Sequence, residues 1–347
     1  MRSSIWFCRK PLYPLVLILA LIISFLPSIS TAEESSSDNS EQTLNAIVSV
    51  RAQVPPSARL VDVLGTSRDG SGIVIDNNGL VLTIGYLIVE ASDVEVTDKE
   101  NKFVPAKVIA YDYDTGFGLV RAVQPLGIDA ISLGQSANLE IGDQTLIISH
   151  TGPQFMQTVE VVDVRDFTGF WEYLLEDAIF TSPPFREFAG AALINKNGDL
   201  VGVGSLIVSD AIAAAPETPG NMFVPIDQLK PIIEELLEHG RRQGNGRPWL
   251  GIYTEMARGH LFITRIADDS PAAHGDLRAN DIVVNVNGSK VVDMAGFFRN
   301  IWSSGKAGVE IELSILRNGE IFTIILKSED RYDWLKLNPR SKYISSL

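Results

Sequence analysis

Short hydrophobic runs separated by turn residues fill the chain from residue 45 to about residue 223. Examples are SGIVIDNNGLVLTI, DQTLIIS, QTVEVVDV and AALINKNGDLVGVGSLIV, where Val, Ile and Leu alternate with Gly, Asn and Asp. Such runs are typical of β-strands joined by tight turns. They form two units of roughly 80–100 residues each, divided near residues 125–127, which predicts two successive β-domains.

One segment follows a helical pattern instead. Residues 225–240 read PIDQLKPIIEELLEHG, and Gly240 stands where helix C-termini favour glycine. The apolar residues recur at helical spacing on one face: Leu229, Ile232, Ile233, Leu236 and Leu237. We therefore predict a helix here, followed by the basic, glycine-containing linker RRQGNGRP.

A third unit covers residues 248–328 and mixes strands with helices. The stretch MAGFFRNIWSS has helical spacing, and VEIELSILRNGEIFTIIL is a hairpin closed by Asn318 and Gly319. A short helix over residues 272–275 precedes the turn–strand–turn unit DLRANDIVVNVNG. The tail from residue 329 to residue 347 is weakly patterned, so we expect it to add little core.

The first 32 residues have the organisation of an export signal. A basic start is followed by the apolar stretch LVLILALIISFL and by the small residues Ser30, Thr31 and Ala32. This pattern predicts a secretory signal peptide over residues 1–32. A retained membrane anchor is the alternative, because the apolar stretch is close to spanning length. Either interpretation exports the rest of the chain, and the polar residues 33–44 form a flexible lead-in.

Composition narrows the chemistry further. The formal net charge is −14 and the sequence pI is about 4.8. A surface this acidic repels nucleic-acid phosphates, so we expect no nucleic-acid partner. Cys8 is the only cysteine and lies inside the leader, which leaves the exported chain without a thiol nucleophile or a disulfide. Four histidines without ligand-like spacing argue against zinc, and we expect no metal and no cofactor.

Several stretches, in order, resemble the HtrA (Deg) family of secreted or periplasmic serine proteases. GSGIVIDNNGLVLT is similar to the hairpin before the family's histidine, and AALINKNGDLVGVGS is similar to the hairpin after its serine. LGQSANLEIGDQTLIIS and FVPID resemble the start and the exit of its second barrel. The resemblance implies a mainly β fold, a trypsin-like double β-barrel followed by an α+β PDZ domain. Its predicted boundaries are a leader at 1–32, a lead-in at 33–44, the barrels at 45–238, a linker at 239–247, the PDZ domain at 248–328 and a tail at 329–347.

All three positions of the family's catalytic triad are altered in this chain. The histidine position in TIGYLIVEA holds Tyr86, the aspartate position in DYDTGFGLV holds Gly116, and the serine position holds Ala189. Acyl transfer needs a nucleophile that can lose a proton, and a methyl group has none. A tyrosine hydroxyl is protonated near neutral pH and is a poor base. We therefore expect no catalytic residues at these positions.

The loop around the altered serine keeps only a remnant of the oxyanion site: Glu187, Phe188 and Gly190. Glu187 replaces a glycine of the family, and its side chain restricts the backbone, so we expect another loop shape. A displaced catalytic set is the alternative. Its candidates are His150, Asp112, Asp114, Ser182, Ser205 and Ser209. No spacing among them favours such a set over ordinary surface or hydrogen-bonding roles.

The resemblance of the third unit to HtrA-type PDZ domains implies a peptide site. PDZ domains add an extended peptide as a strand and hold its terminal carboxylate with successive backbone N–H groups. The candidate loop is Trp249, Leu250, Gly251 and Ile252, and candidate pocket residues are Phe297, Phe298 and Ile301, which alternatively face the core. Aromatic residues of FTGFWEYLLED form either a binding surface or loop anchors: Phe167, Phe170, Trp171 and Tyr173.

The leading hypothesis is a non-catalytic HtrA-like envelope protein that binds peptides, protein C-termini or unfolded proteins as an adaptor, regulator or chaperone-like partner. An active serine endopeptidase with a displaced catalytic set is one alternative, and a structural docking component of an envelope complex is another. The resemblance also implies assembly as a homo-trimer or with an active paralogue.

Overall fold

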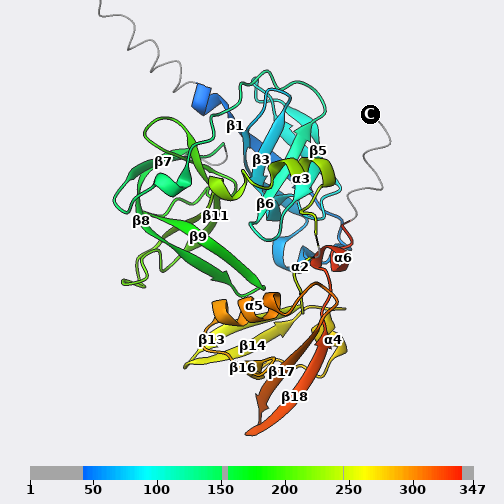
Figure 1. The fold of residues 1–347 in the computed structure, drawn as a ribbon. Coiled ribbons are helices and arrows are strands. Elements are labelled where there is room, and N and C mark those ends of the chain that lie inside the picture. The colour runs from blue at the N-terminus through cyan, green and yellow to red at the C-terminus, as the bar shows by residue number, and fades with distance from the viewer. Residues whose placement is uncertain (1–41, 151–154, 245, 338–347) are drawn as a thin grey trace, which may run out of the picture. The chain divides into compact units, whose positions relative to one another are not determined.

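The computed structural model describes residues 42–150, 155–244 and 246–337 (Figure 1). The predicted leader and nearly all of the lead-in lie outside these residues. In the described part of the chain, every helix is too short or too polar to span a bilayer.

The first β-domain is a closed six-stranded antiparallel barrel with the strand order β1-β2-β3-β6-β5-β4. Two short helical segments, α2 (Val61–Leu64) and η1 (Gly85–Leu87), connect its strands. The strands are β1 (Ile47–Gln53), β2 (Ser67–Val74), β3 (Leu80–Ile84), β4 (Asp93–Thr97), β5 (Phe103–Tyr111) and β6 (Phe117–Ala122). Closure pairs every strand on both sides, so the barrel leaves no free sheet edge.

The second β-domain is also a closed six-stranded barrel, in the order β10-β11-β12-β9-β8-β7. A short turn of 3₁₀ helix, η2 (Ser136–Asn138), precedes it. The strands are β7 (Gln144–Ile148), β8 (Met156–Gly169), β9 (Tyr173–Ser182), β10 (Ala192–Ile194), β11 (Leu200–Val208) and β12 (Gly220–Pro225). The predicted double barrel is confirmed. Its β8 and β9 form a long hairpin whose tip is residues 169–173.

The predicted helix over residues 225–240 is shorter than expected. Strand β12 continues to Pro225, a 3₁₀ turn η3 (Ile226–Gln228) follows, and only α3 (Ile233–His239) is α-helical. Pro231 explains the break, because proline lacks an N–H and disfavours helical backbone at the residue before it. The predicted stop is present: Gly240 has φ 74° and caps the helix in the left-handed conformation.

The third domain is a twisted antiparallel sheet with two helices, in the order β13-β14-β15-β17-β18, with β16 paired to β15. Its hairpin turn at Asn318 and Gly319 has positive φ at both residues, as a type I′ turn requires. Asp293 caps α5 by accepting a hydrogen bond from Gly296 N–H. The elements are β13 (Ile252–Ala257), β14 (His260–Ile266), α4 (Pro271–His274), β15 (Ile282–Val286), β16 (Ser289–Lys290), α5 (Met294–Ser303), β17 (Glu310–Arg317) and β18 (Glu320–Lys327).

The start of the tail contributes core, so the expectation that the tail adds little was wrong for residues 331–337. Helix α6 (Arg331–Trp334) buries Tyr332 and Trp334. The Trp334 ring packs 4.6 Å, centroid to centroid, from the ring of Trp249 at the start of the third domain. The Tyr332 hydroxyl donates to the Tyr111 carbonyl at 2.7 Å, which ties the tail to β5. Two large aromatic side chains therefore compensate for a weak sequence pattern.

Candidate functional site

Tyr86, at the histidine position, lies in η1 and is half-buried. Its hydroxyl donates to the carbonyl oxygen of Ser205 in β11 at 2.9 Å, so it bridges the two barrels. Burial raises the pKa of this hydroxyl far above its ordinary value. The group therefore stays protonated and acts as a structural donor, which is the opposite of what a general base must do.

Gly116, at the aspartate position, has φ 87°, a conformation that favours glycine. Its carbonyl oxygen accepts from the Gly85 N–H at 2.6 Å, which places it directly beside the residue before Tyr86. A Cβ atom at Gly116 would lie only 3.3 Å from the Tyr173 hydroxyl oxygen. That buried hydroxyl donates to the Thr115 carbonyl at 2.6 Å. The phenol ring of Tyr173 thus occupies the space that a carboxylate side chain would need.

Ala189, at the serine position, lies in the loop before β10, and its carbonyl accepts from the Ser71 N–H of β2 at 2.8 Å. Gly190 has φ 72° and donates its N–H to the Gly204 carbonyl of β11 at 2.9 Å. A Cβ at Gly190 would lie 2.0 Å from the Ser71 carbonyl oxygen, so only glycine fits there. The loop is therefore fixed between the two barrels. It lies beside β11, the strand whose Ser205 carbonyl accepts the hydrogen bond from Tyr86.

The remaining residues of the oxyanion loop do not require glycine geometry. Among the described residues with positive φ, Gly190 is the one member of this loop, and Glu187 is not in the left-handed region. The Phe188 carbonyl accepts from the Ala191 N–H at 3.0 Å and closes a tight turn. Glu187 and Phe188 are both half-buried.

The candidates for a displaced catalytic set are spread over separate interactions. The Asp112 carboxylate is held by Arg242, at 3.0 and 2.9 Å, and by the Thr115 hydroxyl at 2.6 Å. Asp114 pairs with Arg247 at 3.3 Å, and burial raises the pKa of Asp114 to about 6. Within residues 42–150, 155–244 and 246–337, no histidine imidazole hydrogen-bonds a serine hydroxyl or an aspartate.

Three of the four residues of the predicted carboxylate loop direct their N–H groups at one side chain. Leu250, Gly251 and Ile252 donate their N–H groups to the Glu172 carboxylate at 3.1, 2.6 and 2.9 Å. Gly251 has φ 80°, and a Cβ there would lie 2.2 Å from the Ser270 Cβ. The N–H of the fourth predicted residue, Trp249, pairs instead with the Glu329 carbonyl at 3.0 Å.

The three predicted pocket residues on α5, Phe297, Phe298 and Ile301, are fully buried in the core of the third domain. Leu174, from the second barrel, packs in the same cluster. Of the aromatic residues at this end of the β8–β9 hairpin, only Phe170 is largely exposed, at 52%, and three pack against the barrel core: Phe167, Trp171 and Tyr173. The loop-anchor alternative therefore describes most of these aromatics.

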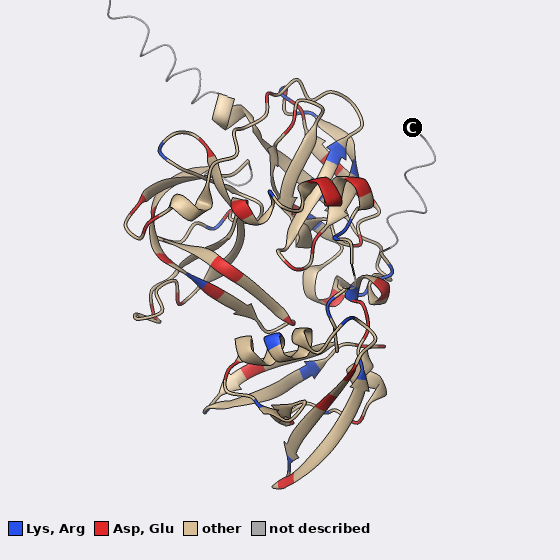
Figure 2. Ribbon diagram, in the orientation of Figure 1, with Lys and Arg blue, Asp and Glu red and all other residues tan. Residues whose placement is uncertain are grey.

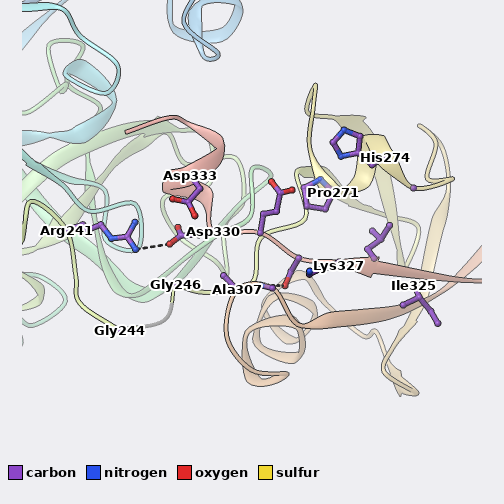
Figure 3. A pocket seen from close by; sticks show the side chains of 15 residues that line it. Arg241, Gly244, Gly246, Pro271, His274, Ala307, Ile325, Lys327, Asp330 and Asp333 are labelled. Atoms are coloured by element: carbon purple, nitrogen blue, oxygen red, sulfur yellow. Dashed lines mark hydrogen bonds and ion pairs between the residues drawn. The ribbon is translucent and has the colours of Figure 1, made fainter. Parts of the chain in front are cut away.

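A separate hollow of about 750 Å³ lies where the linker, the third domain and the tail meet (Figure 3). Arg241 and Asp330 form an ion pair of 2.9 Å on its wall, and His274 and Lys327 point into the same region. The residues that line it include none of the altered triad positions and none of the loop residues 249–252. The hollow is therefore distinct from both predicted sites.

Comparison with known proteins agrees with this architecture. Residues 70–203 match the trypsin-like peptidase domain, and residues 248–327 match the PDZ domain. The chain is 28% identical, over 74% of its length, to a periplasmic serine protease do/HhoA-like protein of Haemophilus influenzae, and 26% identical to the periplasmic serine endoprotease DegP of Salmonella typhimurium. Together these matches agree with a trypsin-like peptidase domain that is followed by a PDZ domain.

The chain spans 57% and 56% of the length of these two relatives. Two solved structures share its fold: the HtrA-type protease AlgW with a decapeptide, and a serine endoprotease from Yersinia pestis. Their TM-scores are 0.53 and 0.51, at 18% and 20% identity. The matches cover 84% of this chain and 98% and 97% of those chains.

Glu172 is the partner of this loop that the sequence did not reveal. It lies in FTGFWEYLLED, a stretch notable for its aromatic residues, and nothing in the spacing connects it with residue 251. It has φ 57°, which is unusual for a residue with a side chain. A glutamate at a turn position that favours glycine or asparagine is the one signal that sequence alone offers.

Proposed function

We propose that this chain is a non-proteolytic, HtrA-like protein of the periplasm or cell envelope that binds peptides or partner proteins through its PDZ domain. The observation that carries the proposal is the chemistry at the three triad positions: a buried donor hydroxyl, a side-chain-free glycine and a methyl group. Loss of a nucleophile or base alone typically lowers turnover by about a million-fold.

Peptide binding is supported by the loop that Gly251 shapes. Three convergent backbone N–H groups are the arrangement by which PDZ domains hold a terminal carboxylate. A solved relative of the same fold, AlgW, carries a decapeptide. The ligand class is therefore an extended peptide with a free C-terminal carboxylate, from an unfolded or partner protein of the envelope.

Two measurements test this function. The purified protein is incubated with unfolded casein and a serine-reactive phosphonate, with a DegP protease as positive control. We expect neither cleavage nor labelling, and both together would establish an active enzyme instead. Binding of a fluorescent decapeptide is then compared with that of its C-terminally amidated form. We expect amidation to abolish binding.

A matched pair of variants assigns the binding to the loop. Gly251→Ala should abolish peptide binding, because both its φ and the contact with Ser270 exclude a Cβ. Gly259→Ala, in the same domain, has φ 76° but open space around it, so it should bind as the parent does. Equal binding by both variants would contradict the assignment.

An active serine endopeptidase is the second candidate, favoured by relatives that are named serine proteases. The phosphonate experiment separates it from the first. The third, a structural docking component, predicts that no peptide binds at any accessible concentration. We also propose, from the resemblance, that the protein assembles as a homo-trimer or with an active paralogue.

A further inference from the structure

The tip of the β8–β9 hairpin lies between β13 and α5 of the third domain. On the strand side, the Thr254 N–H of β13 donates to the Phe170 carbonyl at 2.9 Å, and the Phe170 ring lies 6.1 Å from the ring of Tyr253. This backbone bond is the kind by which an extended peptide joins a sheet edge. The hairpin therefore occupies the strand wall of the groove that the proposed peptide would use.

The helix side of the groove holds the same hairpin. Arg299 of α5 forms an ion pair with Asp166 of β8, and lies 3.7 Å from the Glu176 carboxylate of β9. Arg299 is the one basic residue on α5, and Figure 2 shows a single blue stretch on that helix. Leu174, only 6% exposed, packs in the apolar cluster that contains Phe297 and Phe298. An aliphatic side chain thus fills the position of a peptide side chain.

The hairpin also supplies the carboxylate. The Glu172 side chain accepts three N–H bonds from residues 250–252 and is 5% exposed. A buried carboxylate with three backbone donors is well satisfied, whereas the same loop without it would leave three inward N–H groups to water. Glu172 has positive φ, a conformation that costs free energy for a residue with a side chain. Such a cost indicates a specific role for this residue at the turn.

We propose that the β8–β9 tip is an internal ligand of the PDZ groove: the Glu172 carboxylate stands in for a peptide C-terminus, and a partner binds only after displacing the tip. This inference rests on the proposed peptide-binding function and names how that site is regulated. The partner that displaces the tip offers the same chemistry, a free C-terminal carboxylate and an aliphatic side chain near it.

Competition of this kind lowers the apparent affinity by the fraction of molecules in which the groove is open. Couplings between two binding events typically change affinity by about 5–150-fold. We therefore expect removal of the internal carboxylate to tighten peptide binding by at least about fivefold. The change should appear mainly in the association step, because the parent must first open.

The test compares Glu172→Gln with Asp177→Asn in the full chain purified after export. Glu172→Gln keeps the shape of the side chain. Its NH2 group is a donor, however, and it faces at least one of the three N–H donors whose bonds the carboxylate accepted. Asp177→Asn removes a charge from β9 of the same hairpin, at an exposed residue that also has positive φ, at 52°. Binding of a labelled decapeptide ending in leucine is measured by anisotropy, and amide exchange over residues 250–254 is measured without peptide.

Tighter binding by Glu172→Gln, faster exchange of residues 250–254 in that variant, and parental behaviour of Asp177→Asn would support the internal ligand. Unchanged exchange in Glu172→Gln would overturn it, whether or not any peptide binds. If no variant binds peptide but exchange still accelerates, the internal contact stands and the peptide-binding function falls. If Glu172→Gln fails to fold, Asp166→Asn replaces it. This variant removes the exposed ion pair with Arg299 and must accelerate amide exchange over residues 250–254.

Discussion

The aspartate position of the altered triad is closed by packing, and this can be measured as stability. Gly116→Asp introduces three costs at once. Its φ of 87° is unfavourable for a side chain by about 1–3 kcal/mol. Its Cβ would lie 3.3 Å from the Tyr173 oxygen, and the carboxylate beyond it must displace that buried ring. An unpaired buried polar group costs about another 1–3 kcal/mol.

We therefore expect Gly116→Asp to lower the free energy of unfolding by about 3–5 kcal/mol in urea denaturation. Gly142→Ala is the matched control. It has φ 99° with no atom within 4 Å of the added Cβ. The variant therefore measures only the cost of placing a side chain at positive φ. Adding Tyr173→Ala to Gly116→Asp should give less than the sum of the two costs, because the second change makes room for the first.

Equal stability of Gly116→Asp and Gly142→Ala would refute the reasoning, since it would mean that the space beside Gly116 is open. The same outcome would weaken the proposed loss of proteolysis. It would leave Tyr86 and Ala189 as the two altered positions that still oppose proteolysis.

Three further predictions follow from the described contacts. Burial raises the pKa of Glu172 to about 7 against an ordinary 4.5, although the N–H donors of Ile252 and Leu250 and the charge of Arg331 oppose the shift. The contribution of this group to docking of the tip is therefore fully present below pH 4.5 and is lost as pH rises through 7. Amide protection over residues 250–252, corrected for intrinsic rates, should therefore fall by up to about a hundredfold between pH 5 and pH 8. Glu172→Gln should show no such fall. Tyr86→Phe should cost about 1 kcal/mol of unfolding free energy, through the lost bond to Ser205, and leave peptide affinity unchanged; a large affinity change would contradict a purely structural role. Trp334→Ala should cost about 3–5 kcal/mol in thermal or urea unfolding, and a cost under about 1 kcal/mol would show that the tail is not part of the core.

The fold was largely predictable because its elements are short and local. Apolar runs with turn residues at regular intervals specify strands, and the turn at Asn318 and Gly319 specifies its own hairpin. The helix over residues 225–240 was overestimated because apolar spacing was given more weight than Pro231. The tail was underestimated because two aromatic residues, Tyr332 and Trp334, bury a large area without any periodic pattern.

The candidate sites also differ in how far the sequence predicts them. Positions that depend on a local motif, such as Gly251 in its loop, could be found from the sequence. The role of Glu172 could not, because its three donors are about eighty residues away and only the paired barrels and third domain bring them together. The contact between Tyr173 and Gly116 is equally non-local.

Glu172 and Tyr173 are consecutive residues, the last of the hairpin turn and the first of β9. The Glu172 carboxylate accepts from the N–H groups of residues 250–252, and the Tyr173 hydroxyl lies 3.3 Å from where a Cβ of Gly116 would be. A peptide that displaces this turn from the third domain must therefore also move Tyr173. Displacement of the hairpin tip from the third domain would in this way be transmitted to the surroundings of Gly116 in the first barrel.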